Sequence, residues 1–238
     1  MNSWTTNVRY FEGDTKLLII KYSTSQLPLA HAMRKEAFYG LSLSRLHSHT
    51  LAAKKKKGGL EKLSPADMHF WRDRMRNVAS EGLFYTLYHL FARRALAPLF
   101  GQRISYSAHP EMRVHLAGQA ACSAWHNDAE VTGRYDQVNV WFPLVDTSDS
   151  TCLWVETEYG KKDYRPVPVR YGEALIFDGS CLNHGTVANE SDMSRVSFDF
   201  RFSVLNESPP KLFEKLIAFR PNTDECLNSC EVITRHEA

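Results

Sequence analysis

The first hundred residues show mainly helical spacing of hydrophobic and polar positions. Residues 16 to 22 are the exception, because this short apolar run predicts an early strand. Residues 27 to 46 predict a weakly amphipathic helical region that ends at residues 47 to 50. We therefore expect a mainly helical N-terminal part over residues 1 to 100.

The clearest helix start lies at Ser64. Pro65 then occupies the first helical position, and Asp67 stands three residues after the cap, which is the arrangement of a capping box. Apolar residues recur at helical spacing from there to Phe91, with Gly82 as a candidate break between two helices. We interpret this apolar stripe as core packing.

After Phe100 the pattern changes to short alternating or β-branched runs separated by turn residues, which is typical of antiparallel strands. The predicted strands are residues 112 to 116, 121 to 128, 137 to 143, 151 to 156, 165 to 170, 173 to 178 and 194 to 204. Helices followed by this many strands indicate an α+β fold. Its core would be a double-stranded β-helix, the jelly roll of the cupin type, with the N-terminal helices packed against it. We expect a single domain over residues 1 to 238, with the jelly-roll core at 101 to 206 and a C-terminal extension at 207 to 238.

Composition and charge narrow the class of protein. The 238 residues are 43% hydrophobic and 24% charged, which suffices for one substantial core. Lys plus Arg number 29 against 27 for Asp plus Glu, so the formal charge of +2 does not favour a nucleic-acid partner. The N-terminus lacks a secretion signal pattern, and no apolar run approaches the roughly 20 residues that cross a bilayer. We expect a cytoplasmic protein without a membrane partner, of unknown oligomeric state.

Two further features have ordinary explanations. The basic run from Lys54 to Lys57 precedes two glycines and is interpreted as a solvated loop, with a phosphate or membrane contact as the alternative. The five cysteines include no C-x-x-C pair, and their odd number fits a reducing compartment better than secretion. Cys226 and Cys230 stand four residues apart, and we interpret them as structural or incidental.

A candidate metal site consists of His126, Asp128 and His184. His126 and Asp128 are two residues apart, so on a strand they point to the same face and can hold one ion. His184 follows the predicted strand at 173 to 178 and can supply the third donor. Two imidazoles and one carboxylate leave three positions of an octahedral ion open, which suits iron(II) oxygen chemistry. A structural zinc site would instead fill its coordination with protein ligands, usually including cysteine.

A candidate anion site lies on the last predicted strand. Arg195, Ser197, Asp199 and Arg201 point to one face of that strand, while apolar residues alternate on the other face. A guanidinium inside a barrel is costly unless it meets an anion. The far carboxylate of 2-oxoglutarate would be that anion, held by a bidentate pair to Arg195 and a hydroxyl bond from Ser197. An ion pair between Arg195 and Asp199 within the strand is the alternative.

Together these residues resemble the metal and co-substrate signature of iron(II)/2-oxoglutarate-dependent dioxygenases. Longer stretches resemble the branch of that family that includes the oxygenase proposed for streptomycin biosynthesis. They are Arg113-Val-His-Leu, Val138-Asn-Val-Trp-Phe-Pro-Leu, Leu153-Trp-Val-Glu, Asp163-Tyr-Arg-Pro, Tyr171-Gly-Glu-Ala-Leu-Ile-Phe-Asp-Gly and Ser194-Arg-Val-Ser-Phe-Asp-Phe-Arg. The resemblance covers roughly residues 110 to 204 and leaves out the N-terminal third. Halogenases of this superfamily lack the metal carboxylate, and Asp128 is present here.

The resemblance implies an enzyme that uses iron(II), 2-oxoglutarate and O2 to hydroxylate an unactivated C–H bond, giving succinate and CO2. The implied substrate is a small polar metabolite of natural-product biosynthesis, such as an amino acid, an aminocyclitol or a guanidino compound. Asn139 and Arg113 are expected near 2-oxoglutarate or substrate. Trp141, Glu156 and Arg201 are the candidates for substrate contacts.

Two alternatives remain open at this point. One is a cupin-like binding or sensor module whose metal is structural or lost, which would form no succinate. The other is an enzyme that oxidises a protein or nucleic-acid side chain, for which Lys54 to Lys57 is the only hint. The sequence does not identify the substrate, or choose among hydroxylation, desaturation and ring formation.

Overall fold

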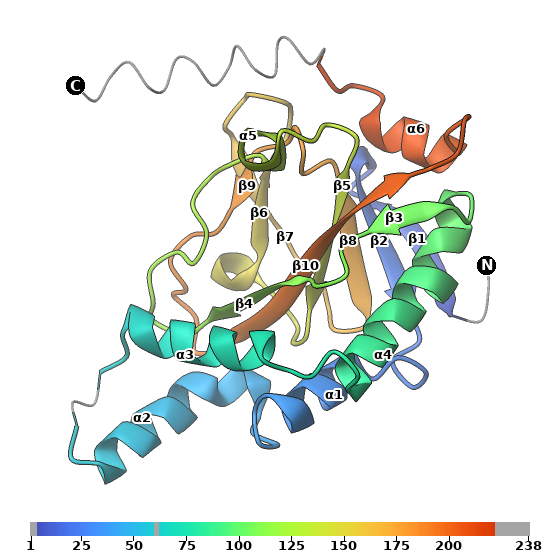
Figure 1. Ribbon diagram of the computed structural model, residues 1–238. Helices are drawn as coiled ribbons and strands as arrows, with labels where there is room; N and C mark the ends of the chain where they lie inside the picture. Colours follow the sequence, from blue (N-terminus) through green and yellow to red (C-terminus); the bar gives the residue numbers. More distant parts are fainter. Residues whose placement is uncertain (1–3, 60–61, 222–238) are drawn as a thin grey trace.

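The alternating and helical runs of the sequence become strands and helices in a computed structural model that describes residues 4–59 and 62–221 (Figure 1). The strands are β1 (Thr5–Phe11), β2 (Asp14–Tyr22), β3 (Ile104–Tyr106), β4 (Glu111–His115), β5 (Val138–Pro143), β6 (Leu153–Glu156), β7 (Tyr164–Val167), β8 (Glu173–Phe177), β9 (His184–Gly185) and β10 (Arg195–Val204). The helices are α1 (Leu29–Glu36), α2 (Leu46–Lys56), α3 (Pro65–Arg76), α4 (Leu83–Leu90), α5 (Asp128–Thr132) and α6 (Lys211–Ile217). Short turns of 3₁₀ or π helix are η1 (Leu43–Arg45), η2 (Phe91–Leu96), η3 (Ala97–Phe100) and η4 (Asp149–Thr151).

The strands form two antiparallel sheets. The larger sheet has seven strands in the order β1-β2-β8-β5-β10-β3, and β4 pairs with the opposite end of β10 from β3. The smaller sheet has the order β7-β6-β9. The combination of helices with antiparallel sheet agrees with the fold class that the sequence predicts. Six of the seven predicted strands are confirmed within two or three residues at their ends.

An N-terminal hairpin extends the larger sheet. β2 contains the predicted strand at 16 to 22 and pairs with β8, where Leu17 lies opposite Phe177. β1 escapes prediction from the sequence because only its two end residues are buried and the residues between them are mostly polar. Two strands therefore come from the part of the chain that the sequence predicts as mainly helical.

The helix start at Ser64 is confirmed. α3 begins at Pro65, and Asp67 Oδ2 accepts a hydrogen bond of 2.8 Å from the backbone N–H of Ser64. Gly82 precedes α4 as its N-cap residue, so the predicted break between two helices is also confirmed. The apolar face of α3, represented by Met75, is buried in the helix-side core, as expected for core packing.

The expected helical region at 27 to 46 is wrong in its extent. α1 ends at Glu36, and the chain then turns through Tyr39 and Gly40, which both have positive φ. Glycine adopts this backbone conformation without strain, which favours a turn there. Residues 47 to 50 consequently lie inside α2 and do not end a helix.

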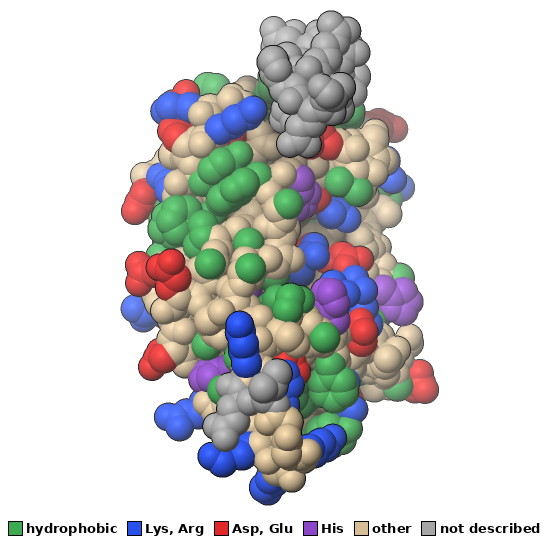
Figure 2. All heavy atoms as spheres, turned by 90° about the vertical axis from the view of Figure 1, so that its left-hand side faces the viewer, with side chains coloured by type: hydrophobic (Ala, Val, Ile, Leu, Met, Phe, Trp, Pro, Cys, Tyr) green, Lys and Arg blue, Asp and Glu red, His purple; other side chains and the backbone are tan. Residues whose placement is uncertain are grey.

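The basic run is also not a loop. Lys54, Lys55 and Lys56 form the last turn of α2, where their charges favour the negative end of the helix dipole. Lys54 Nζ contacts Asp67 Oδ2 at 2.5 Å, which joins α2 to α3. Lys55 to Lys57 are exposed, as expected, and basic side chains gather at the lower end of the face shown in Figure 2.

Two apolar cores cover the two faces of the larger sheet. On the helix side, Phe198 of β10 stacks on Phe142 of β5 at 4.7 Å and meets the edge of Phe84 of α4 at 5.2 Å. Between the two sheets, Trp141 of β5 packs in a second core with Val155 of β6. Burying a large side chain of this kind contributes about 2–3 kcal/mol. Because neighbouring residues of β10 point to opposite faces, its odd-numbered residues face the space between the sheets.

From β4 onward the chain passes several times from one sheet to the other. β4, β5, β8 and β10 belong to the larger sheet, and β6, β7 and β9 belong to the smaller one. Between β4 and β5, the chain joins the smaller sheet through a single antiparallel bridge between His126 and His184. The chain therefore crosses the space between the sheets repeatedly. The bridge between His126 and His184 lies at the edge of the smaller sheet.

The C-terminal part adds one helix. α6 packs against β2 and buries Phe213 and Leu216 in the helix-side core. Cys226 and Cys230 lie outside the described residues. None of the described helices is both long and apolar enough to cross a membrane.

Candidate metal centre and adjoining pocket

The chain around His126 changes from a bridge into a helix. His126 exchanges backbone hydrogen bonds of 3.1 and 2.8 Å with His184. Asn127 then caps α5 with its side chain, and Asp128 is the first residue of that helix. The predicted strand at 121 to 128 is therefore wrong, and so is the argument that His126 and Asp128 share a strand face. The strong preference of Asn for the N-cap position is the physical reason.

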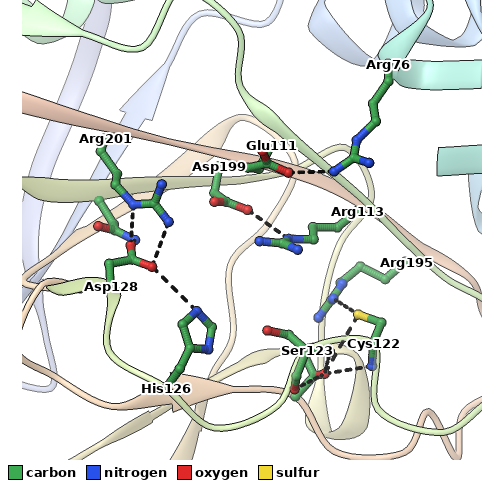
Figure 3. A network of polar contacts seen from close by, with 12 residues as sticks. Arg76, Glu111, Arg113, Cys122, Ser123, His126, Asp128, Arg195, Asp199 and Arg201 are labelled. Carbon is green, nitrogen blue, oxygen red and sulfur yellow. Dashed lines mark hydrogen bonds and ion pairs between the residues drawn. The ribbon is translucent and has the colours of Figure 1, made fainter. Parts of the chain in front are cut away.

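The three predicted donors nevertheless converge. One donor atom from each of His126, Asp128 and His184 lies within 4.8 Å of the others, and His126 Nε2 is 3.5 Å from Asp128 Oδ1 (Figure 3). Two ligands at right angles on an ion, each bound at about 2.1 Å, are about 3 Å apart. Small side-chain movements therefore bring the donors onto one ion. Gly185 permits this approach, because a Cβ there would lie 2.8 Å from the Trp125 ring.

Backbone carbonyls fix the orientation of both imidazoles. His126 Nδ1 lies 2.8 Å from the carbonyl oxygen of Ala124, and His184 Nδ1 lies 3.0 Å from that of Leu182. Because a carbonyl oxygen only accepts, each Nδ1 carries a hydrogen, and Nε2 is the ring nitrogen left to bind a metal. Burial lowers the pKa of His184 to about 4, whereas the hydrogen bond with Asp128 raises the pKa of His126. His184 is therefore neutral at pH 7, as a ligand must be.

The carboxylate of Asp128 is held by two residues of the larger sheet. Arg201 of β10 donates to both of its oxygens, at 2.6 and 2.7 Å, and Asn139 of β5 donates to Oδ2 at 2.5 Å (Figure 3). Burial acts to raise the pKa of Asp128, but hydrogen bonds from His126 and Arg201 outweigh burial and hold that pKa below its ordinary value. The carboxylate is therefore ionised and oriented. The sequence suggests Arg201 as a substrate contact. In the structure its guanidinium instead binds Asp128, one of the predicted metal donors.

Residues 178 to 182 connect the two donor-bearing segments. The backbone N–H of Asp128 donates to the carbonyl oxygen of Gly179 at 2.8 Å, and that of Ala129 donates to Ser180 at 3.2 Å. His184 follows directly on the same segment. The relative positions of the donors are thus set by backbone hydrogen bonds.

A buried ion pair anchors this connecting segment. Asp178 is fully buried and accepts hydrogen bonds from Tyr159 Oη at 2.9 Å and from Arg220 Nε at 2.8 Å. Arg220, which follows α6, also contacts the second oxygen of Asp178 and the carbonyl oxygens of Tyr135 and Gln137. The chain after α6 therefore binds the segments on either side of the metal centre, a role that no sequence motif indicates.

A pocket opens beside the three donors. Its lining consists of Arg113, Ser123, His126, Asp128, Asn139, Trp141, Leu153, Phe177, His184, Thr186, Arg195 and Asp199. The pocket is narrow, with a volume of about 20 Å³ between the side chains, which is room for an ion with about one water. The predicted residues Arg113, Asn139, Trp141 and Arg195 thus lie at the same pocket as the donors.

Arg195 is buried without a counter-ion. Its side chain is 1% exposed, and Nη1 donates to the carbonyl oxygens of Thr151 and Cys152 at 3.3 and 3.2 Å. Nη2 lies 2.9 Å from Cys122 Sγ (Figure 3). Within residues 4–59 and 62–221, no carboxylate lies at ion-pair distance from this guanidinium. The alternative of an Arg195–Asp199 pair is therefore wrong, because Asp199 pairs with Arg113 at 3.2 Å.

Several buried polar atoms near Arg195 lack partners. Among the described residues, Arg195 Nε, Ser197 Oγ and Asn139 Oδ1 are buried and form no hydrogen bond within the protein. Buried polar groups are normally satisfied, because leaving one without a partner costs about 1–3 kcal/mol. Water or a ligand is therefore needed to satisfy these atoms.

Glu156, which the sequence suggests as a candidate substrate contact, is not among the residues that line the pocket. Its side chain is fully buried, and Oε1 accepts a hydrogen bond of 2.7 Å from the backbone N–H of Asn183. Oε2 accepts from the backbone N–H of Lys162 at 3.2 Å. Glu156 therefore orients the residue that precedes His184.

Other pocket residues were missed by sequence reasoning. Ser123 and Thr186 come from loops without a recognisable motif, whereas Leu153 and Phe177 belong to strands where an apolar residue is expected in any core. Asp199 stands on the predicted face of β10, but only the pairing of β10 with β4 reveals Arg113 as its partner.

Two solved structures have partly similar folds. EvdO2 of Micromonospora carbonacea var. aurantiaca in complex with 2-oxoglutarate is 14% identical, with 87% of this chain and 97% of that chain covered and a TM-score of 0.44. AviO1 of Streptomyces viridochromogenes Tue57 is 14% identical, with 81% and 91% covered and a TM-score of 0.45. Similarities at this level do not bear on the chemistry of this chain.

A curated protein is more similar in sequence. The chain is 35% identical over 119 residues to the streptomycin biosynthesis protein StrG of Streptomyces griseus, with 50% of this chain and 54% of that protein covered. The chain thus spans about half the length of this relative. No family model matches the chain. By sequence, the chain is similar over half its length to a protein of streptomycin biosynthesis.

Proposed function

We propose that this chain is an iron(II)- and 2-oxoglutarate-dependent oxygenase that hydroxylates an unactivated C–H bond of a small polar metabolite in natural-product biosynthesis. One observation carries the proposal: three converging donors of the 2-His-1-carboxylate type share a pocket with a buried guanidinium that has no carboxylate partner among the described residues. The name of the similar StrG protein supports the assignment to natural-product biosynthesis.

The donor set supports iron(II). Two neutral imidazoles and one ionised carboxylate on one side of an ion leave three positions open, which is the arrangement of non-haem iron(II) oxygenases. The donors of His126, Asp128 and His184 are oriented by carbonyls and by Arg201, and such outer contacts fix ligand geometry. Purified protein is expected to carry nickel, copper or zinc as well, because this site type binds them at least as tightly.

The surroundings of Arg195 support 2-oxoglutarate. A fully buried guanidinium is costly without an anion, and a dicarboxylate bound to the metal at one end would supply its far carboxylate. Ser197 Oγ is an orphaned donor on the same strand face. Because the pocket is narrow, Arg195 must exchange its contacts with Cys122 and the carbonyl oxygens of residues 151 and 152 for that carboxylate.

The alternation of strands supports the jelly-roll assignment. From β4 to β10 the chain passes back and forth between two facing sheets, as strands of a double-stranded β-helix do. Small ligands commonly bind between the sheets of such barrels. His126 and His184 stand at the edge of the smaller sheet, where the barrel mouth would lie.

In this assignment, bound iron(II) with 2-oxoglutarate and O2 would supply the oxidising chemistry, with succinate and CO2 as co-products. The chain holds the reactants. Arg195 binds the co-substrate, Arg201 and Asn139 keep Asp128 in place, and Trp141 with Phe177 provides an apolar wall that excludes water. Substrate must be placed with one C–H bond facing the ion, which the narrow pocket favours.

The test is succinate formation by protein reconstituted with iron(II) under air. We expect formation that depends on 2-oxoglutarate, and none in folded His126→Ala or Asp128→Ala variants. Arg195→Ala should weaken 2-oxoglutarate binding about 100-fold, as expected for about 3 kcal/mol from charge-assisted hydrogen bonds. Arg76→Gln, which changes a surface ion pair, is the matched control. Wild-type protein that forms no more succinate than His126→Ala would identify a binding module instead.

A further inference from the structure

A second cavity adjoins the metal pocket. This cleft, of about 170 Å³, lies between α3 and the chain that follows β4, and its lining includes Met68 and Arg72 of α3, Arg113 of β4 and Cys122. α3 packs on β4 at the lower left of Figure 1, and Figure 2 views the molecule from that side. The cleft is larger than the space beside the donors, so it is the better place for the bulk of a substrate.

The cleft is positively charged. Arg72, Arg113 and His69 are the ionisable side chains that line it apart from Cys122, and its lining contains no carboxylate. Arg113 shares its charge with Asp199, whereas Arg72 has only a contact of 3.8 Å with Asp73. The charge of Arg72 is therefore the less compensated of the two, and a cleft with low-dielectric walls strengthens its attraction for an anion. The apolar part of the lining, such as Met68 and Val114, provides such walls.

Arg72 differs from the other arginines of α3. Arg74 donates to the carbonyl oxygen of Ala37 at 2.7 Å, and Arg76 pairs with Glu111 at 2.8 Å. Arg72 has only a long ion pair of 3.8 Å to its neighbour Asp73, and its buried Nε lacks a hydrogen-bond partner among the described residues. Among the arginines of α3, Arg72 is therefore the one with the weakest contacts in the protein, and its guanidinium has donors available for a ligand.

The cleft and the metal pocket share a wall. Arg113 lines both cavities and donates to Asp199 only through Nε, at 3.2 Å. In Figure 3 its remaining guanidinium nitrogens point toward the space beside Asp128. Cys122 lines the cleft and contacts Arg195 of the pocket. A ligand seated in the cleft would thus lie one side chain away from the metal centre.

We propose that this cleft binds an anionic group of the substrate, a carboxylate or a phosphate, at Arg72 and beside Arg113. The C–H bond to be oxidised then reaches the metal past Arg113. This inference rests on the proposed function and narrows the substrate class to metabolites that carry a negative charge. A purely cationic aminocyclitol or guanidino compound would bring no anion to Arg72 and would be repelled by its charge.

The first experiment measures anion binding directly. Protein is loaded with nickel(II) and 2-oxoglutarate, so that Arg195 is occupied, and is titrated calorimetrically with inorganic phosphate and with acetate. We expect a Kd on the order of 1 mM for the better probe. The preferred probe tells whether the natural group is a phosphate or a carboxylate. Arg72→Gln should weaken that binding at least tenfold, whereas Arg76→Gln, on the same helix, should leave it unchanged.

The results separate this proposal from the proposed function. If neither probe binds, or if Arg72→Gln binds as wild type does, the anion site is refuted even when the enzyme forms succinate. Probe binding that Arg72→Gln loses supports the site. Such binding together with absent succinate formation would refute the oxygenase assignment and leave the anion site standing.

Discussion

Replacing Arg220 with methionine removes the guanidinium that contacts the carboxylate of Asp178, while it keeps most of the aliphatic volume. Asp178 is fully buried, and the side chain of Arg220 is 13% exposed. Removing one partner of a buried ion pair costs about 3–5 kcal/mol, because a charge is left without compensation. Tyr159 still donates to Asp178, so we expect the lower end, about 3 kcal/mol.

The free energy of unfolding is measured by urea denaturation, and the melting temperature is expected to fall by roughly 6–12 °C for a chain of this size. Arg76→Met is the control, since its ion pair with Glu111 is 44% and 46% exposed and contributes at most about 1 kcal/mol. The double variant Arg220→Met with Asp178→Asn removes both charges and should recover more than half of the loss. Equal unfolding midpoints for Arg220→Met and Arg76→Met would refute the reasoning.

Two further predictions concern the site. Arg201→Leu removes both hydrogen bonds from this residue to the Asp128 carboxylate. The affinity for manganese(II), measured by calorimetry, should fall 10- to 100-fold. An unchanged affinity would contradict the proposal that Arg201 orients Asp128. Burial, with the nearby charge of Arg195, lowers the pKa of His115 to about 4, below the 6.5 of an unperturbed histidine. The unfolded chain therefore binds more protons between these values, so this residue makes the free energy of unfolding fall by up to about 3 kcal/mol as the pH drops from 6.5 to 4. His115→Gln should lose that portion of the pH dependence, and parallel curves for both proteins would argue against it.

The strands and helices with strong local patterns were predictable from the sequence. β10 alternates large apolar residues with polar ones over ten residues, and α3 carries a capping box, so both elements were expected near their observed ends. β1 was not predictable, because only its two end residues are buried and it is held by pairing with β2. The segment around Asp128 misled the prediction, since a helix cap there outweighs a pattern that looks like a strand.

The chemical types of the residues predicted which candidate metal donors converge, although the predicted strand around them was wrong. His126, Asp128 and His184 were chosen because their side chains suit one ion, and the bridge between His126 and His184 brings them together in a way that spacing alone does not reveal. The partner of Arg201 was not predictable. A cation on the inner face of a strand is expected to meet an anion, but the sequence does not show whether that anion is Asp128 or a substrate.

The metal pocket and the cleft beside α3 are formed by different parts of the molecule. The positions of the three candidate metal donors depend on backbone hydrogen bonds between residues 126–129 and 179–184, which do not involve the side chains of α3. One wall of the cleft, in contrast, is a solvent-accessible helix contributed by the N-terminal third. Under the proposed function, substitutions in α3 would therefore change which metabolite is accepted and leave the candidate metal donors in place.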